Sequence, residues 1–470
     1  MSERLYKYGL VAIFVIGVLL RCVLFIQNAS LWGDEAALAF NVCNKSYREL
    51  FGGLDILQAS PVGFTLMVKF LLNSINPQSD YARDFILRVI PFISGILIIP
   101  IFYYLVELIF KDNKKAKLIS LFFFVINPCA VAYSAQFKQY STELLCSVLI
   151  LIGFYKLLTT DKYKWQYSFL FAVVPWFSYS SFFVLAAGFS CLLIKNWRLC
   201  IKIALPVFFS CIIYYFLSLK SVFAVNLSNM IDCWSGCYGF MDFRHPLRFL
   251  FKFGELFAVG KLFSALTGFV FFAVCIKYCF YRDNSLRKLL FLLPLGLTIL
   301  ASLMHKYAIQ GRLVLFLLPT FAIMIALMND RLTNSLKWTM AVFMSISLLN
   351  YTPTEISYSY SRQIVNYLKE NIKSDDIIVL DHGKRFNEYD IYLDAYIPNE
   401  RIYLNTNICG KKYINACRDS LIALPSGNYY FLSSSYFVEE ITKGFTTKSL
   451  DLGFKPKKIK AIYFTKESRL

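Results

Sequence analysis

The chain has 470 residues, of which 57% are hydrophobic and 18% aromatic, and its formal net charge is +19. Apolar runs near 20 residues recur from residue 8 to about residue 351, and each is long enough to cross a bilayer, which excludes a soluble protein. The basic residues are divided among short loops between these runs, which argues against nucleic-acid binding. We therefore predict a polytopic α-helical protein whose basic loops also attract anionic lipid head groups.

The first run, residues 8–27, follows a short basic N-terminus and is longer than the apolar core of a signal peptide. We interpret it as an uncleaved first span. With the N-terminus inside, the five loops assigned to the inside are all basic, as the positive-inside rule requires. About eleven spans result, and this odd number places residues 352–470 outside. The runs are 8–27, 88–110, 118–134, 141–159, 165–179, 181–195, 202–219, 257–280, 287–305, 312–329 and 335–351.

The first outer loop, residues 28–87, contains a short apolar segment at 60–75 that holds Lys69. If this segment crossed the membrane, every later basic loop would face outward, so we place it in the outer interface as a helix or re-entrant piece. Whether it spans stays open. Residues 79–90 indicate another surface helix, with Arg83, Asp84 and Arg88 on its polar side.

Composition changes after Pro353. An amphipathic helical pattern precedes a short apolar strand that ends before Asp-His-Gly, and residues 428–435 and 460–467 have strand character. We predict a membrane domain at 1–351 and a small extracytoplasmic α/β domain at 352–470.

The 13 cysteines divide into two groups. Nine lie in or beside apolar segments and are expected to fill the core. The pairs Cys233/Cys237 and Cys409/Cys417 lack the spacing of zinc ligands, so outside the cell membrane we expect disulfides.

Residues 28–42 read NASLWGDEAALAFNV and place Asp34 and Glu35 just beyond the first span. One interpretation is an ordinary helix start, where acidic residues favour the positive end of the helix dipole. The other is general-base catalysis, in which a carboxylate removes the proton of an attacking hydroxyl or amine. The two are compatible, because a helix start is a rigid place for a base.

Cations at the outer ends of later spans are candidate ligands of a lipid phosphate. Lys138, Lys306 and Arg312 lie in these loops, and Arg312 is the most specific because it opens an apolar span after Gly311. The alternative for both lysines is snorkelling of the side chain to the interface. A purely structural role for Glu143 would be an ion pair with Lys138.

The order of these motifs resembles the GT-C superfamily of membrane glycosyltransferases, within it the protein O-mannosyltransferase and aminoarabinose transferase group and bacterial transferases that decorate lipopolysaccharide. LWGDE matches the acidic motif of the first outer loop, and Ser60-Pro61 matches a Pro-Pro motif in part. Lys138-Gln139-Tyr140 stands where relatives carry Arg-x-Tyr. GRLVLFLLP resembles Arg-Tyr-Leu-x-x-x-x-Pro with Leu313 in place of Tyr.

The resemblance implies a GT-C fold and transfer of a hexosyl or pentosyl group, with inversion, from a polyprenyl-phosphate donor to an envelope glycan, lipid or protein. Asp34 would be the base, with Glu35 beside it. The implied location is the inner (cytoplasmic) membrane, with the active site outside. The implied donor-phosphate ligands are Arg312, Lys138, Lys306, Tyr140, Arg83 and Arg88.

Two other functions remain open. A lipid flippase would favour ionisable residues deep in several spans or matching broken helices, and few such charges and no repeat occur. A polysaccharide polymerase or ligase would not need the acidic pair. The sequence requires no cofactor, although some members of the superfamily use a divalent cation, Mg²⁺ or Mn²⁺, and others do not.

Overall fold

The computed structural model describes most of residues 2–328 and parts of the chain beyond them. The gaps in the first part are 57, 161–163, 225–230, 232–233, 236–238, 243 and 259–260. The later described residues are 338, 341–342, 344–347, 360–380, 390–393, 401–403, 419–432, 442–443, 447–450 and 461–466. Cys233, Cys237, Cys409 and Cys417 lie outside the described residues, as does most of the run expected at 335–351.

The chain divides into two compact units. Unit 1 consists of Met1–Asn28, Lys45–Asn76 and Phe85–Pro353, and unit 2 of Ala29–Asn44, Pro77–Asp84 and Thr354–Leu470. The sequence places the whole loop 28–87 with the membrane domain, whereas the structure groups two of its segments with the C-terminal residues.

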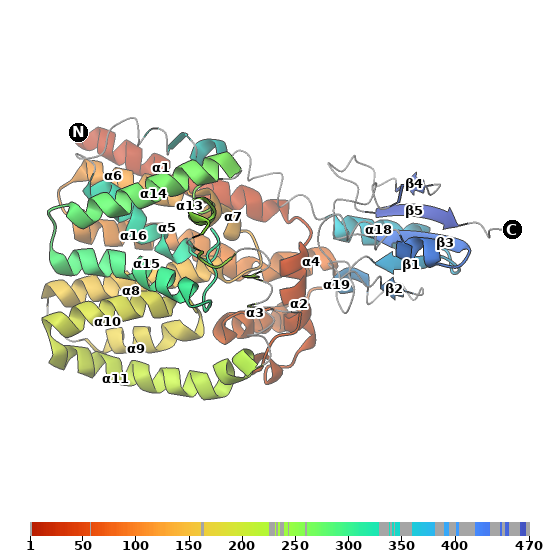
Figure 1. The fold of residues 1–470 in the computed structure, drawn as a ribbon, viewed down its shortest axis with the longest axis horizontal. Helices are drawn as coiled ribbons and strands as arrows, with labels where there is room; N and C mark the ends of the chain where they lie inside the picture. Colours follow the sequence, from red (N-terminus) through yellow and green to blue (C-terminus); the bar gives the residue numbers. More distant parts are fainter. Residues whose placement is uncertain are drawn as a thin grey trace. The chain divides into compact units, whose positions relative to one another are not determined.

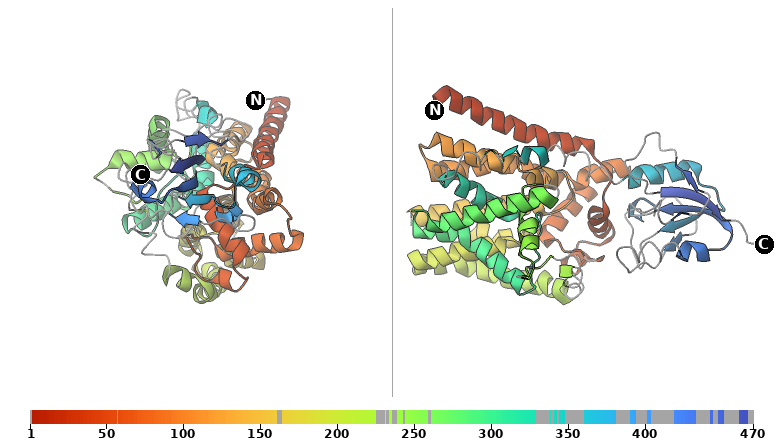
Figure 2. Two further views of the ribbon diagram at one scale, coloured as in Figure 1. Left: turned by 90° about the vertical axis from the view of Figure 1, so that its right-hand side faces the viewer. Right: turned by 45° about the horizontal axis from the view of Figure 1, so that its top comes forward.

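Unit 1 is a bundle of helices (Figures 1 and 2). Asn113, Asn127, Asn196 and Asn284 each begin a helix by accepting a backbone N–H, which satisfies donors that the first turn leaves open. The elements are α1 (Glu3–Gln27), η1 (Glu49–Phe51), α3 (Val62–Ile75), α5 (Val89–Phe110), α6 (Lys114–Val125), α7 (Pro128–Tyr133), α8 (Tyr140–Thr160), α9 (Trp165–Val173), η2 (Val174–Trp176), α10 (Ser181–Lys195), α11 (Trp197–Tyr214), η3 (Tyr215–Leu219), α13 (Pro246–Gly254), α14 (Lys261–Phe280), α15 (Ser285–Leu303), η4 (Leu315–Leu317) and α16 (Leu318–Leu327).

Six helices in the described part of the chain are long and apolar enough to cross a membrane. They are Glu3–Gln27, Asp80–Phe110, Tyr140–Thr160, Trp197–Ala224, Leu262–Phe280 and Ser285–Leu303. Shorter apolar helices cover Val62–Ile75, Ser181–Lys195 and Leu315–Leu327. With 14 residues, α3 is about 21 Å long, less than the hydrocarbon thickness. The helix expected at 60–75 is confirmed.

Four of the basic loops lie at one end of unit 1, where Figure 1 marks the N-terminus. Lys114 pairs with Glu3, and Lys117 pairs with Glu107 at 2.6 Å. Lys195 donates to the carbonyl of Leu158 at the same end, and Cys191 Sγ approaches the carbonyl of Leu286. These contacts join the start of α6 to α1 and α5, and α10 to α8 and α15.

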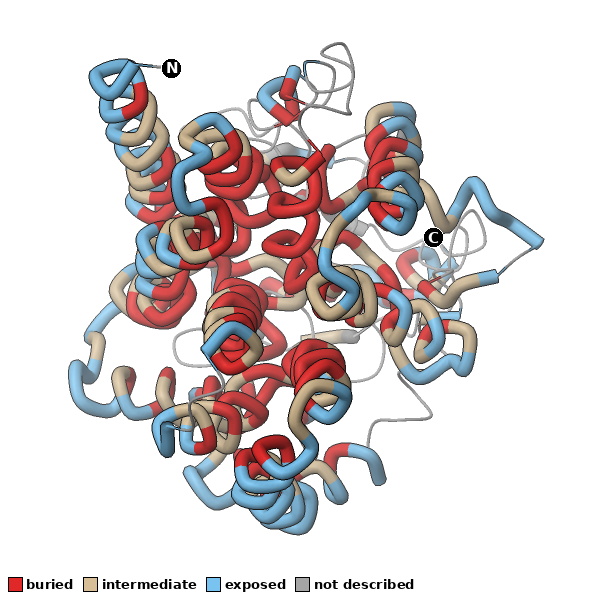
Figure 3. The backbone as a smooth tube through the Cα atoms, turned by 90° about the vertical axis from the view of Figure 1, so that its left-hand side faces the viewer, coloured by how far each residue is buried: buried red, intermediate tan, exposed pale blue. Residues whose placement is uncertain are grey.

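The interior of the bundle is apolar, and the buried sides of the helices face one another (Figure 3). Aromatic rings fill much of it, as in the stacked pair Phe102 and Phe124 with centroids 3.8 Å apart. The tightest helix contact joins α13 to α14. A Cβ on Gly254 or Gly268 would overlap a carbonyl of the facing helix, so the two backbones touch.

Unit 2 contains a five-stranded mixed sheet in the order β2-β1-β3-β5-β4. β1 pairs in parallel with β2 and β3, whereas β5 pairs antiparallel with β3 and β4. The helix and strands expected after residue 360 are confirmed in α18, β1, β3 and β5. The elements of the unit are α2 (Gly33–Asn44), α4 (Asp80–Leu87, which ends in unit 1), α18 (Ser361–Asn371), β1 (Ile377–Leu380), α19 (Asp390–Leu393), β2 (Arg401–Tyr403), β3 (Gly427–Leu432), β4 (Thr447–Ser449) and β5 (Ala461–Lys466).

Candidate functional site

Asp34 and Glu35 occupy the first turn of α2 in unit 2. Glu35 is 1% exposed, and its Oε2 accepts the backbone N–H of Trp32 at 3.3 Å. Glu35 therefore caps the start of α2, which is the structural role that the sequence analysis gives as one interpretation of the acidic pair. Asp34 is half-buried on the same turn. Of the two carboxylates, Asp34 is the more accessible one and the better candidate for a base.

The start of α2 is fixed to the C-terminal residues of unit 2. The Tyr392 hydroxyl accepts the backbone N–H of Leu31 at 2.9 Å, and Ser30 Oγ donates to Gln363 at 2.5 Å. Tyr392 also donates to Asp84 Oδ2 at 2.7 Å. Burial beside that carboxylate raises the pKa of Tyr392 well above its usual range. Buried, hydrogen-bonded side chains of unit 2 thus hold the acidic motif in place.

Arg83 and Asp84 are not on a solvent-facing polar side, which corrects the sequence expectation. Asp84 is fully buried and pairs with Arg362 at 2.6 Å and with Arg83 at 3.2 Å. Arg83 also pairs with Asp80 at 2.8 Å and donates to the carbonyl of Ile391. Arg362 and Ile391 come from distant segments of unit 2, which local sequence cannot reveal. They give Arg83 a structural role.

Arg88 is also buried rather than on a polar surface, and is 1% exposed in unit 1. Its Nη1 donates to Asn28 Oδ1 at 3.1 Å, so it ties the start of α5 to the end of α1. Asn28 has a φ of 40° at the C-terminus of α1, where the chain must leave the helix. The contact thus holds inside unit 1 a side chain that the pattern of 79–90 placed on a polar surface.

Lys138 does not pair with Glu143. Lys138 is 4% exposed, and its Nζ donates to Gln58 Oε1 at 2.7 Å. Glu143 accepts from Ser180 Oγ at 3.0 Å and from the backbone N–H of Tyr179 at 3.2 Å. The two charged side chains contact different segments of the chain, because residue 138 precedes α8 whereas residue 143 lies in its first turn. Burial of the Lys138 ammonium also excludes simple snorkelling.

Arg312 and Tyr140 meet through a residue that the sequence did not single out, Tyr133. The rings of Tyr133 and Tyr140 are edge to face, with centroids 5.0 Å apart. The Arg312 guanidinium interacts with the Tyr133 hydroxyl. Tyr133 ends α7 and Tyr140 begins α8, so Arg312 and Tyr140 both lie near these two helix ends, whereas the Lys138 ammonium is directed to Gln58. A cation beside tyrosine hydroxyls suits an oxyanion.

Glu255 is the second residue that sequence analysis missed. It follows α13, and its Oε2 accepts the backbone N–H of Gly311 at 3.3 Å. Its Oε1 pairs with Lys252 at 3.4 Å, and the charge of Arg312 also acts on it. Burial raises the pKa of Glu255 despite these partners. The amphipathic pattern of 246–254 was the available signal, since it marks a surface helix that ends at an acidic residue.

Lys306 and His305 lie in the turn after α15, and both are exposed. His305 has a φ of 57°, and its ring packs against Phe240 with centroids 4.9 Å apart. Lys306 fits the snorkelling alternative better than a fixed ligand. No group of three or more His, Cys, Asp or Glu side chains that could hold a metal occurs among the residues that the structure describes.

Comparison with known proteins identifies solved structures of similar fold. No protein family and no curated protein matches the sequence. The crystal structure of ArnT from Cupriavidus metallidurans bound to undecaprenyl phosphate matches with a TM-score of 0.54 and 9% identity, over 98% of this chain and 98% of that chain. The apo structure of the same ArnT matches with a TM-score of 0.52 and 11% identity, over 97% and 98%.

The apo oligosaccharyltransferase from Archaeoglobus fulgidus matches with a TM-score of 0.50 and 12% identity, over 86% of this chain and 65% of that chain. At these identities the likeness concerns the fold. It agrees with the motif order in the sequence and with the six long apolar helices. The chain is a multi-pass helical membrane protein whose fold is similar to that of ArnT.

Proposed function

We propose that this protein is a membrane glycosyltransferase that moves a sugar from a polyprenyl-phosphate donor to a cell-envelope glycan, lipid or protein. The observation that carries the proposal is the nearly full-length likeness to an ArnT that binds undecaprenyl phosphate. The sequence supports it independently, because the acidic motif at Asp34 and the cation at Arg312 occur in the order typical of GT-C enzymes.

In the proposed reaction, Asp34 accepts the proton of the acceptor nucleophile as that atom attacks the anomeric carbon. The bond from this carbon to the phosphate oxygen breaks, the configuration inverts, and the lipid phosphate leaves with the electron pair. Arg312, Lys138 and Tyr140 are the proposed phosphate ligands in unit 1. A fixed cation and hydroxyl donors stabilise the charge that develops on the leaving oxygen.

We further propose about eleven spans in the inner membrane, with the N-terminus inside and residues 352–470 outside. The shared end of four basic loops supports this orientation. Reporter proteins fused after residues 115, 200 and 360 test it. A fusion at 360 that is active only in the cytoplasm would refute the orientation. Mg²⁺ or Mn²⁺ stays a candidate cofactor, and chelation followed by addition of either ion tests it.

The decisive experiment compares envelope glycans, by mass spectrometry, in cells with the wild-type gene, without it and with Asp34→Asn. Asparagine keeps the size and the helix start but cannot accept the proton. We expect transfer to fall by roughly a hundredfold or more, with normal insertion. Glu35→Gln is the matched control and should cost less. Equal transfer by wild type and Asp34→Asn would show that the acidic pair only starts a helix.

A further inference from the structure

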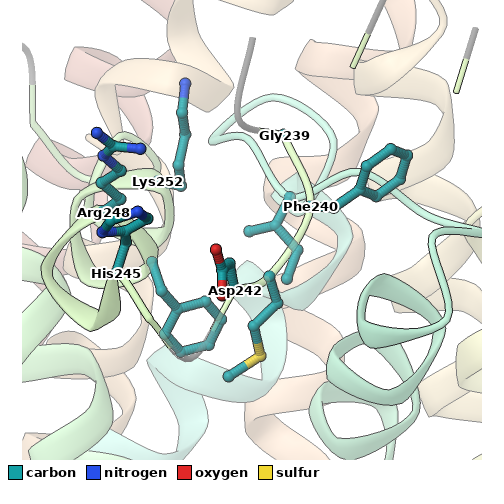
Figure 4. A pocket seen from close by; sticks show the side chains of 9 residues that line it. Gly239, Phe240, Asp242, His245, Arg248 and Lys252 are labelled. Atoms are coloured by element: carbon teal, nitrogen blue, oxygen red, sulfur yellow. The ribbon is translucent and has the colours of Figure 1, made fainter. Parts of the chain in front are cut away.

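A small cavity lies beside α13 in unit 1, next to the loop that carries Arg312. Its volume is about 30 Å³. His245, Arg248 and Lys252 line one side, and Asp242 lies between them and Phe240 (Figure 4). Arg248 and Lys252 are four residues apart on α13 and therefore share a helix face. Arg248 and Lys252 face one lining carboxylate, Asp242, so the lining carries one excess positive charge, and Lys252 also pairs with Glu255 outside the lining.

Hydrogen bonds of backbone N–H groups hold the walls of the cavity in place. Ile309, on its wall, donates its N–H to the carbonyl of Gly239 at 2.6 Å, and Met241 donates its N–H to Ser302 Oγ at 2.9 Å. Asp242 accepts a hydrogen bond from the backbone N–H of Arg244 at 2.9 Å, so one oxygen of this carboxylate already has a partner. These bonds fix the segment at 239–242 against the end of α15.

The size of the cavity limits the ligand. A buried water needs roughly 10–15 Å³, so about two waters fit here, and a sugar ring does not. The terminal oxygens of a phosphoryl group do fit. An arginine fork beside a lysine point charge is the combination that binds such oxygens, and the apolar wall strengthens the attraction.

The surroundings indicate where the phosphoryl group comes from. Along the chain, α13 stands between the helices Trp197–Ala224 and Leu262–Phe280, which can both cross the membrane, and it packs against the second of them. Leu247, next to Arg248, is 74% exposed, so apolar and basic surface stand side by side. A surface of this kind suits the boundary between lipid head groups and acyl chains.

We propose that the cavity binds the phosphoryl group of an anionic phospholipid from the surrounding bilayer. The site borders the Arg312 loop through Ile309 and through the pair of Lys252 with Glu255, and lipid binding there does not require that the proposed function be correct. Arg248 is the side chain to test. Lys252 is less suitable because it also pairs with Glu255, so its loss would disturb the loop that carries Arg312.

The test uses full-length protein extracted from vesicles of phosphatidylglycerol or of phosphatidylcholine, with retained lipid measured by native mass spectrometry. We expect the wild type to retain phosphatidylglycerol, and Arg248→Gln to bind it roughly tenfold more weakly, because a charge-assisted bond is lost. Arg282→Gln is the matched control. It removes the same charge from an exposed position that does not line the cavity.

Three outcomes would overturn the proposal. Equal losses in the two variants would show attraction by general surface charge. Equal retention of phosphatidylcholine would show that no anionic lipid is selected. Release of phosphatidylglycerol by inorganic phosphate alone would show that the ligand is a soluble phosphate. Thermal unfolding in phosphatidylcholine checks that both variants fold, and sugar transfer is measured separately.

Discussion

Gly311 should be the most sensitive position for the placement of Arg312. A Cβ at residue 311 would lie 2.5 Å from the carbonyl carbon of Glu255, 2.7 Å from its oxygen and 2.8 Å from its Cβ. Two of these atoms are backbone, so they cannot rotate away. The φ of Gly311 is outside the left-handed region, so an alanine meets a steric obstacle and not a strained conformation.

Gly311→Ala should therefore push the loop away from Glu255 and break the 3.3 Å hydrogen bond between them. Overpacking of this kind typically costs about 1–3 kcal/mol of stability. Arg312 is the next residue and moves with the loop. A displacement near 1 Å at a positioning group can lower the rate about a hundredfold. We expect a moderate loss of stability and a much larger loss of function.

The assays are thermal unfolding of the purified protein, binding of undecaprenyl phosphate, and glycan modification in cells. Gly296→Ala is the matched control, because its Cβ would have no atom within 4 Å. An alanine inside the helix α15 should be neutral or stabilise by about 0.5–1 kcal/mol. If Gly311→Ala and Gly296→Ala behave alike in all three assays, the contact with Glu255 does not position Arg312.

Two further predictions concern buried charges. Asp84→Asn leaves Arg362 without its 2.6 Å partner and should destabilise unit 2 by about 3–5 kcal/mol. Faster hydrogen exchange in α18 measures this loss, whereas the exposed Asp375→Asn should change little. The second prediction concerns pH: the folded pKa of Glu255 is raised above its usual 4.5, so the folded state holds this proton to higher pH than the unfolded state. Stability should thus fall as pH rises from 4.5 through the folded pKa, and a wild type no steeper than Glu255→Gln in that window would contradict the assignment.

Periodic features could be predicted from the sequence. The six long apolar helices, the short helix at 60–75 and the strands β1, β3 and β5 follow from patterns that span a few neighbouring residues. The runs expected at 118–134, 165–179 and 312–329 are instead broken or shorter helices. The basic loops share an end because each separates two apolar segments, which is again a local property. The strand pairing was not predictable in the same way, since β3 pairs with β1 and β5 across long stretches of chain.

Side-chain partners were the part that sequence reasoning could not supply. Asp84 meets Arg362 across 278 residues, and Lys138 meets Gln58 across 80. The nearer charge, Lys138, was the partner expected for Glu143, and that expectation was wrong. The contribution of Glu255 was also hidden, because its bond reaches the backbone of Gly311 and requires no particular side chain there.

The backbone contact between α13 and α14 links the Arg312 loop to the mechanics of the bilayer. At Gly254 and Gly268 the backbones of α13 and α14 touch, and no flexible side chain lies between them. We therefore expect the two helices to tilt together as one body. A transmembrane helix changes its tilt when the hydrocarbon layer becomes thicker or thinner. Glu255 follows Gly254 directly and holds Gly311, so we expect bilayer thickness to shift the position of Arg312 without any ligand.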